Sequence, residues 1–386
     1  MALSWDIFCR VVDNFGDIGV CWRLSRQLAA EQGAKVRLWS DDLSSLQALC
    51  PQVDTAAAVQ HVEGIEICRW GGEFPAVTPA QVVIEGFGCG LPDAYIGAMV
   101  RRSPRTLWIT LEYLSAEPWV RGHHGLPSPH PQWPLERYFF FPGFVAGTGG
   151  VMREAGLFAQ RAAFGDGDKR QLWAELGFEQ PAAEATVVSL FAYDCAPVTD
   201  LLAACEHGQT LTVVAIPAGR IVEPVQAWLG VGAAGVGRSF RRGQLEVRLV
   251  PFVSQPRYDH LLWACDCNLV RGEDSFVRAQ WAGKAMIWQV YPQQGRAHWP
   301  KLEAFLDLYC EGLPQEAAAA IRAMWRVWNS VGEAPRPPLA EAWREFQAQR
   351  IALENYAPVW ADKLAEVGEL SEMLAQFCQD KLKYRF

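Results

Sequence analysis

Asp13 and Asp17 lie four residues apart in the segment DNFGDIG, which follows a β-rich run and precedes a helical pattern. Glycines let such a loop turn tightly and approach a ligand, and the start of the helix offers backbone N–H groups. Two carboxylates at this spacing can converge on one cationic or proton-losing group. The alternative interpretation is that Asp17 only caps the helix.

Asp41 and Asp42, at the end of the next strand pattern, raise the question of a dinucleotide site. The glycines of the first loop follow G-x-x-G and not the G-x-G-x-x-G of nucleotide-binding turns. Asp13 and Asp17 would also repel a pyrophosphate. The sequence therefore argues against NAD binding.

A second strand-to-helix turn, LVRGEDSF over residues 269–276, carries groups suited to a diphosphate. Gly272 permits the turn, and Glu273, Asp274 or Ser275 can cap the helix that follows. The N–H groups and dipole of that helix suit an anion, and Arg271 adds a fixed positive charge. The alternative is a well-capped structural helix whose acidic neighbours hold the arginine.

Aromatic residues near strand ends offer a platform for a base. Phe191 and Tyr193 end one strand pattern, and Phe252 and Gln255 follow another. A pyrimidine could stack on Phe252 while Gln255 reads its edge. The alternative for each aromatic residue is a place in the core.

The sequence predicts no metal site. Asp166-Gly167-Asp168 resembles the D-x-D of some glycosyltransferases, but it lies in an expected interdomain linker and is interpreted as a solvated turn. Three histidines in a proline-rich loop, residues 123–130, have no acidic or cysteine partners at ligand spacing. The 11 cysteines form no C-x-x-C, which favours reduced thiols in a cytoplasm.

Short β-rich runs alternate with helical stretches, and this pattern predicts parallel sheets with helices on their faces. The first series of expected strands is Trp5–Val12, Lys35–Trp39, Ile65–Arg69, Val82–Glu85 and Thr106–Thr110. The second series is Thr186–Phe191, Leu211–Ile216, Leu245–Val250, Asn268–Val270 and Ala285–Val290. The clearest expected helices are Ile18–Glu31, Val198–Glu206, Arg257–Cys265, Phe276–Ala282 and His298–Phe305.

Residues 117–150 are interpreted as an irregular loop region, and the tail over residues 315–383 as helical with a break near 334–338. These elements predict two sequential α/β domains, which bind ligands at the carboxyl ends of their strands. The predicted domains are residues 1–180, completed by a helix at 360–386, and residues 181–359.

Composition excludes several classes of protein. With 386 residues, 50% hydrophobic and 20% charged, the chain is not dominated by disorder. A net charge of −8 argues against coating nucleic acid or an anionic membrane. No signal peptide and no run of 18 apolar residues is visible, so a cytoplasmic protein is expected. The 17 tryptophans are unusually many and are expected mostly in cores.

The two loop motifs, together with SLFAYD, WQVYPQ and the helical tail, resemble the protein-arginine rhamnosyltransferases that modify bacterial elongation factor P, the EarP family. The resemblance extends across essentially the whole chain. It implies an α/β fold of the GT-B type, in which two Rossmann-like domains face each other and a C-terminal helix crosses back to the first. It also implies inverting transfer of L-rhamnose from dTDP-β-L-rhamnose to an arginine of elongation factor P, which relieves ribosome stalling at polyproline, without a metal or other cofactor.

The resemblance also assigns residues. Asp13, Asp17 and Glu273 resemble the catalytic carboxylates of the family, and Asn14, Phe15 and Gly16 belong to the acceptor-side loop. The residues that resemble the donor-binding set are Tyr193, Phe252, Gln255, Arg271, Asp274 and Ser275.

A guanidinium is a poor nucleophile, so carboxylates must hold it and accept its proton as the C–N bond forms. We expect Asp17 to be the base, Asp13 to orient the guanidinium and Glu273 to position the sugar or acceptor. Arg271 and the helix starting near Ser275 would stabilise the departing dTDP. Three alternatives remain: a GT-B transferase with a lipid or small-molecule acceptor, a nucleotide-sugar epimerase, and a non-enzymatic binding module.

Overall fold

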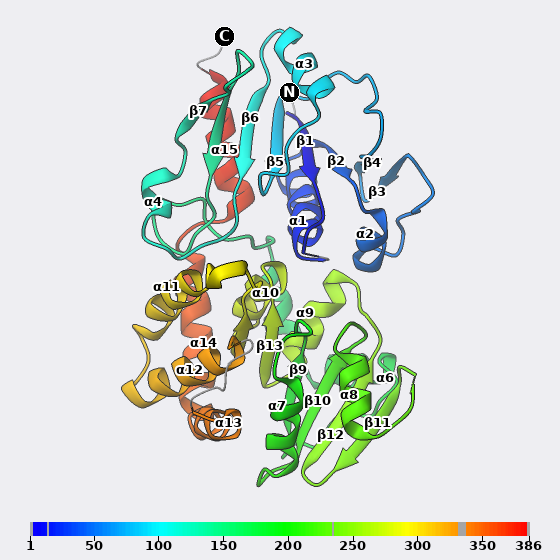
Figure 1. Ribbon diagram of the computed structural model, residues 1–386, viewed down its shortest axis with the longest axis vertical. Coiled ribbons are helices and arrows are strands. Elements are labelled where there is room, and N and C mark those ends of the chain that lie inside the picture. Colours follow the sequence, from blue (N-terminus) through cyan, green and yellow to red (C-terminus); the bar gives the residue numbers. More distant parts are fainter. Residues whose placement is uncertain (1–2, 14, 234, 331–336, 384–386) are drawn as a thin grey trace. The chain divides into compact units, whose positions relative to one another are not determined.

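The computed structural model describes residues 3–13, 15–233, 235–330 and 337–383, and these form two compact units (Figure 1). The first unit comprises Met1–Ala155 and Lys363–Phe386, and the second comprises Gly156–Asp362. Each unit is an α/β assembly built on its own largely parallel sheet. The expected alternation of strands and helices is confirmed in both.

The sheet of the first unit has the strand order β3-β4-β2-β1-β5-β6-β8-β7. Its strands are β1 (Ser4–Cys9), β2 (Lys35–Ser40), β3 (Val59–Val62), β4 (Ile65–Arg69), β5 (Val82–Gly86), β6 (Leu107–Leu111), β7 (Pro127–Pro129) and β8 (Glu136–Phe140). All neighbours are parallel except the edge pairs β3–β4 and β7–β8. The strand order reverses between β1 and β5, and such a reversal is where open α/β sheets bind ligands.

Buried apolar residues account for the central strands of this sheet. Every residue of β5 and β6 is buried, as expected for strands covered on both faces. The helices of the unit are α1 (Gly16–Glu31), α2 (Leu43–Leu49), α3 (Asp93–Arg101), α4 (Val120–His123) and α15 (Leu370–Lys383). β1 ends at Cys9, so the expected strand to residue 12 is too long, and residues 10–13 form the loop before α1.

The helix α15 belongs to the first unit although it is distant from it in sequence. It packs against α1 and β6, and Val151 forms a parallel bridge with Glu369 just before the helix starts. The ring of Phe377 on α15 contacts Tyr138 and Phe140 of β8 at centroid distances of 5.8 and 5.7 Å. The last helix therefore supplies part of the core of the first unit.

The sheet of the second unit has the order β11-β12-β10-β9-β13-β14. Its strands are β9 (Thr186–Leu190), β10 (Thr212–Pro217), β11 (Arg238–Arg242), β12 (Leu245–Val250), β13 (Cys267–Arg271) and β14 (Ala285–Gln289). Only β11 is antiparallel to its neighbour. The order reverses between β9 and β13, which gives this unit its own switch point.

Helices follow most strands of the second unit and continue into the tail. They are α5 (Leu157–Ala163), α6 (Asp166–Glu175), α7 (Val198–Glu206), α8 (Val222–Leu229), α9 (Gln255–Ala264), α10 (Asp274–Ala282), α11 (Trp299–Cys310), α12 (Gln315–Trp328), α13 (Leu339–Ala348) and α14 (Arg350–Ala365), with a 3-10 turn at Gln294–Arg296. The helical tail is thus confirmed, while most of its expected break lies outside the described residues.

Tryptophan fills the cores of both units, as expected from the sequence. In the first unit Phe8 stacks on Trp39 at 5.7 Å. In the second, Phe276 stacks on Trp288 at 3.8 Å, and Trp325 is fully buried. Flat rings packed in this way bury large apolar areas with little loss of side-chain entropy.

The segments expected to be irregular are more ordered than the sequence suggested. Residues 117–150 contain α4, β7 and β8. Asp166-Gly167-Asp168 is exposed, as expected, but it forms the start of α6 and not a linker turn, and Asp168 accepts the backbone N–H of Gly165 at 2.8 Å. Trp173 on α6 is buried in a cluster of the second unit, so the expected boundary at residue 180 falls inside that unit.

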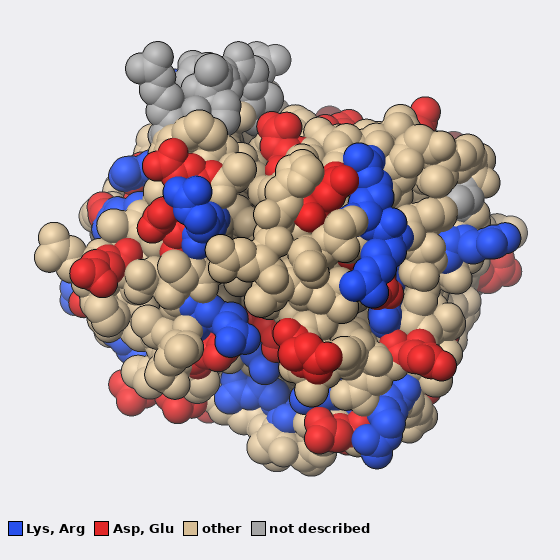
Figure 2. Space-filling model, turned by 90° about the horizontal axis from the view of Figure 1, so that it is seen from below, with Lys and Arg blue, Asp and Glu red and all other residues tan. Residues whose placement is uncertain are grey.

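The described residues include no helix that combines the length and the apolar character needed to span a bilayer. Figure 2 shows one face of the molecule, on which basic and acidic side chains are interspersed. On this face the mixed charges do not form the extended single-sign field that binds a polyanion.

Candidate active site

Asp17 lies in the first turn of α1, directly after the loop that follows β1. Its side chain is 2% exposed, and its Oδ2 accepts the backbone N–H groups of Val12 and Asp13, each at 2.9 Å. The hydroxyl of Tyr113 donates to the other carboxylate oxygen at 3.1 Å. Phe15 occupies the N-cap position and makes no side-chain capping bond. Asp17 therefore organises the loop rather than capping the helix.

Asp13 and Gly16 close this loop tightly. The N–H of Gly16 donates to the carbonyl of Asp13 at 2.6 Å, and a Cβ placed on Gly16 would lie 2.6 Å from Oδ2 of Asp13. Only glycine leaves room for the half-buried Asp13 carboxylate at this position. The structure thus brings Asp13 and Asp17 together in one loop, whereas Asn14 lies outside the described residues.

The acids at the end of β2 have structural partners. Asp41 accepts the backbone N–H of Val11 at 2.9 Å. Asp42 caps α2 by accepting the N–H groups of Ser44 and Ser45. These bonds agree with the argument against a dinucleotide site at this position.

Sequence reasoning missed two aromatic residues beside the carboxylates. Phe87 follows β5 and Tyr113 follows β6, and their rings stack at 4.4 Å with an angle of 16° between planes. Tyr113 is 39% exposed although its hydroxyl contacts Asp17. Their place directly after consecutive strands of the sheet was the available signal, since carboxyl ends of parallel strands gather at one edge.

Two thiols of the first unit, Cys9 at the end of β1 and Cys89 after β5, have raised pKa values. A hydrogen bond with Cys21, burial and the negative charge of Asp17 raise the pKa of Cys9 well above its ordinary value. Burial also raises the pKa of Cys89. The raised pKa values make the thiolate forms of Cys9 and Cys89 poor candidates for a base.

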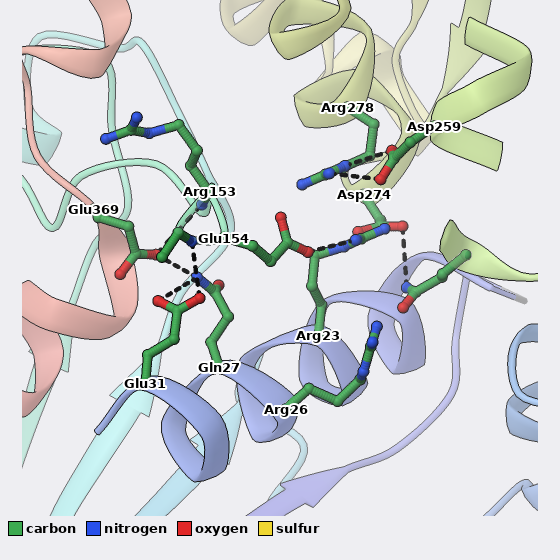
Figure 3. A network of polar contacts seen from close by, with 12 residues as sticks. Arg23, Arg26, Gln27, Glu31, Arg153, Glu154, Asp259, Asp274, Arg278 and Glu369 are labelled. Atoms are coloured by element: carbon green, nitrogen blue, oxygen red, sulfur yellow. Dashed lines mark hydrogen bonds and ion pairs between the residues drawn. The ribbon is translucent and has the colours of Figure 1, made fainter. Parts of the chain in front are cut away.

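A polar network holds α1 in place on the side away from the loop (Figure 3). Arg23, which is 2% exposed, forms an ion pair with Glu154 at 2.6 Å. Gln27 donates to Glu369 at 3.2 Å, and the same carboxylate oxygen accepts the backbone N–H of Arg153 at 3.3 Å. The helix α1, which carries the buried carboxylate of Asp17, is therefore fixed to residues 153–154 and to Glu369, just before α15.

In the second unit, Arg271 ends β13 at the switch point and is buried among aromatic rings. Its guanidinium lies 4.4 Å from the ring centre of Phe191 and 4.5 Å from that of Tyr193. The backbone N–H of Tyr193 donates to the side chain of Gln289 at 2.8 Å. Arg271 and Tyr193, both expected to bind the donor, are thus brought together in a fixed arrangement.

The turn after Arg271 follows the expected strand-to-helix course. Gly272 has a φ of 63°, which favours glycine, and Glu273 takes the N-cap position of α10 without a side-chain capping bond. The hydroxyl of Ser275 donates to the carbonyl of Arg271 and accepts its N–H at 3.2 Å. The expectation that Glu273 or Ser275 caps α10 is therefore wrong. Glu273 makes no side-chain capping bond, and Ser275 binds the backbone of the preceding strand instead.

The remaining expected donor residues lie around α9. Gln255, 2% exposed, donates to Asp274 at 3.2 Å. Asp259 on α9 binds the buried Arg278 of α10 through bonds of 2.7 and 2.6 Å, which holds the two helices together (Figure 3). Phe252 is half-buried in the loop after β12.

The two groups of residues differ in charge and lie in different units. Asp13 and Asp17 offer negative charge in the first unit and suit a cation. In the second unit Arg271 and the N-terminus of α10 offer positive charge and suit an anion. Among the described residues no cluster of three or more His, Cys, Asp or Glu is arranged as a metal site.

Comparison with known proteins assigns the family. Residues 5–379 match the family model of the elongation factor P (EF-P) rhamnosyltransferase EarP. Protein-arginine rhamnosyltransferases of Pseudomonas putida and Pseudomonas aeruginosa are each 45% identical to this chain and align over 99% and 98% of it and 100% of their own length. That of Neisseria meningitidis is 33% identical over 98% of both chains.

Solved structures agree in fold. A structure described as the basis for EarP-mediated arginine glycosylation of translation elongation factor EF-P covers 98% of this chain and 99% of its own, with a TM-score of 0.68 and 34% identity. MurG of Acinetobacter baumannii has a TM-score of 0.51 at 11% identity, with 98% and 100% coverage, and so shows the fold alone. The chain has the GT-B fold, belongs to the EarP family of EF-P rhamnosyltransferases and is a glycosyltransferase.

Proposed function

We propose that this protein transfers L-rhamnose from dTDP-β-L-rhamnose to an arginine side chain of elongation factor P, with inversion at the sugar carbon. The observation that carries the proposal is the loop after β1, where Asp13 and Asp17 are held together at the switch point. Relatives over the full length are named protein-arginine rhamnosyltransferase.

The first unit supplies the acceptor site in this proposal. A guanidinium has a pKa above about 12 and delocalised lone pairs, so it must be held in position and lose its proton during attack. Asp17 is buried and fixed by three hydrogen bonds, which gives its carboxylate one defined direction. Asp17 accepts the proton, and Asp13 orients the guanidinium.

The second unit supplies the donor site. Arg271 and the N-terminus of α10 bind the diphosphate, and Ser275 holds the turn through the backbone of Arg271. Tyr193, Phe252, Gln255 and Asp274 contact the nucleotide and sugar. Glu273, the N-cap residue of α10, positions the sugar or the acceptor.

The chemical step is a single displacement. A guanidinium nitrogen attacks the anomeric carbon on the face opposite the diphosphate, the N–C bond forms and the C–O bond to dTDP breaks. The nitrogen gives one proton to Asp17, and Arg271 stabilises the charge that develops on the leaving diphosphate. One displacement inverts the β-linkage of the donor to an α-linkage in the product.

The test is intact-mass analysis of elongation factor P after incubation with this protein and dTDP-β-L-rhamnose. The expected result is a gain of one deoxyhexose residue, an α-anomeric proton signal in the product and release of one dTDP. Elongation factor P whose target arginine is replaced by lysine serves as the control and stays unmodified. An unchanged mass with all components folded would contradict the proposal, and dTDP release without modification would indicate a different acceptor.

The proposal places the reaction in the cytoplasm and without a metal ion or other cofactor. The 11 free cysteines support a reducing compartment. Transfer is expected to proceed at the same rate with EDTA present, because Arg271 and α10 supply the positive charge that a metal provides elsewhere. Loss of activity on chelation, restored by a divalent cation, would contradict this part.

A further inference from the structure

We propose that Phe87 and Tyr113 form an aromatic wall of the acceptor site, in which Tyr113 positions the Asp17 carboxylate and the stacked rings receive the flat face of the guanidinium. This inference rests on the proposed function and adds two residues to it. Three adjacent strands carry the argument, because β1, β5 and β6 deliver Asp17, Phe87 and Tyr113 to one edge of the sheet.

Phe87 is held in an unusual backbone conformation. Its φ is 55°, in the left-handed region that residues other than glycine rarely adopt. Its N–H donates to the carbonyl of Leu111 at 2.7 Å, which ties the loop to the end of β6, and Gly86 and Gly88 flank it. Strained residues of this kind persist where the surrounding structure determines them, and they concentrate at ligand sites.

Tyr113 combines a fixed hydroxyl with an accessible ring. The hydroxyl donates to Oδ1 of Asp17 at 3.1 Å, on the oxygen that does not accept the loop N–H groups. The side chain is nevertheless 39% exposed, and its partner Phe87 is half-buried. A stacked pair with one exposed ring beside carboxylates is suited to a planar cation, since guanidinium groups stack on aromatic faces.

The electrostatic surroundings of Asp17 make the hydroxyl important. The titratable groups near it are Asp13 in the same loop, the thiols of Cys9 on β1 and Cys21 on α1, and the hydroxyl of Tyr113. Among these groups the hydroxyl of Tyr113 donates a hydrogen bond to the carboxylate of Asp17. Loss of the hydroxyl therefore removes a donor that favours the charged carboxylate.

The central test is Tyr113→Phe, which keeps the ring and removes the hydroxyl. The free energy of a hydrogen bond to a charged group corresponds to a factor of roughly ten or more in a rate or equilibrium constant, so we expect kcat to fall about tenfold. The acidic limb of the pH profile of kcat should move up by about one pH unit, because the base then binds its proton more readily. The KM for elongation factor P and the Kd for dTDP should stay within about twofold, since the stacked pair and the second unit are unchanged.

Phe87→Leu tests the stacking surface separately. The variant keeps an apolar side chain and removes the aromatic face, so the KM for elongation factor P should rise roughly 3- to 30-fold. Its acidic limb should stay where it is in the wild type, because Tyr113 still donates to Asp17. A raised KM with an unshifted limb is a result that general loss of structure would not produce.

Tyr95→Phe is the matched control. The Tyr95 hydroxyl donates to the buried carboxylate of Asp6, another tyrosine–aspartate bond in the same unit, but Asp6 lies within β1 and not at its carboxyl end. This variant should lower the melting temperature and leave kcat, KM and the pH profile unchanged.

The outcomes separate the two proposals. If the wild-type protein does not modify elongation factor P, the proposed function fails. If the wild type is active and Tyr113→Phe shows an unshifted acidic limb with unchanged kcat, the positioning of Asp17 by Tyr113 is overturned. If Phe87→Leu leaves KM unchanged in the active protein, the stacking surface is overturned.

Discussion

Replacing Asp17 with asparagine separates the chemistry of this carboxylate from its structural contacts. The two side chains have the same shape. In the wild type, Asp17 accepts the N–H groups of Val12 and Asp13, both at 2.9 Å. The amide oxygen of asparagine can still accept these two groups, and its NH₂ can donate to the hydroxyl of Tyr113. The variant should therefore fold with the same loop.

The cost in stability can be worked from these three bonds. Hydrogen bonds to a charged acceptor are roughly twice as strong as neutral bonds, which contribute about 1 kcal/mol each. Loss of the charge thus removes about 3 kcal/mol of stabilisation from the three hydrogen bonds. Part of this loss is offset because a neutral amide has a lower desolvation penalty in a site that is 2% exposed. We expect a net loss of about 1–2 kcal/mol, which lowers Tm by a few degrees.

The loss of activity should be much larger. General base catalysis contributes about 10²- to 10⁴-fold, and asparagine cannot accept the proton. Initial rates of elongation factor P modification, measured by intact mass, should fall by that factor. Calorimetric titration with dTDP should give an unchanged Kd, because the residues proposed to bind the donor belong to the second unit.

Asp41→Asn is the matched control for this variant. Asp41 also accepts a backbone N–H of the loop, that of Val11 at 2.9 Å, but it is exposed. Its replacement should leave the rate within about twofold. Near-normal turnover by Asp17→Asn, or an equal loss in both variants, would refute the assignment of Asp17 as the base.

Three further changes test other parts of the structure. Gly16→Ala places a methyl group 2.6 Å from the Asp13 carboxylate and should lower kcat about tenfold or more with unchanged dTDP affinity; unchanged kcat would exclude a function for this carboxylate. Asp259→Ala removes the carboxylate that forms a short ion pair with buried Arg278 and should cost about 3–5 kcal/mol in denaturant unfolding, whereas a cost below about 1 kcal/mol would contradict this. Burial lowers the pKa of His124 in the folded protein, so the unfolded chain binds the proton more readily and Tm should decline as pH falls below about 6.5. His124→Asn should weaken this decline. An identical decline in the variant would refute the contribution of His124.

The central strands and the first loop could be predicted from local sequence. Short runs of mostly apolar residues locate β5 and β6, and the spacing of Asp13 and Asp17 indicates a site after β1. Each of these features depends on residues close together in the chain. The edge strand β11, with the sequence RSFRR, carries no such apolar pattern and was not predicted.

The rest of the site depends on the order of strands in the sheet. Phe87 and Tyr113 are distant in sequence from Asp17, and apart from their position after strands their local sequence does not distinguish them from core aromatics. They meet the carboxylate only because β1, β5 and β6 are neighbours. Ser275 was likewise expected to cap α10, but the close return of its hydroxyl to Arg271 depends on the tight turn at Gly272.

The position of α15 has a consequence for how this protein is made. Residues 363–386 leave the ribosome only after the whole of the second unit, yet they complete the core of the first unit, where Phe377 packs on β8. During synthesis the second unit can fold as one continuous segment, whereas the first must wait with part of its core open. The carboxylate loop after β1 is among the first segments translated and acquires its final support only with α15, so a chain that stops within α14 has an incomplete first unit.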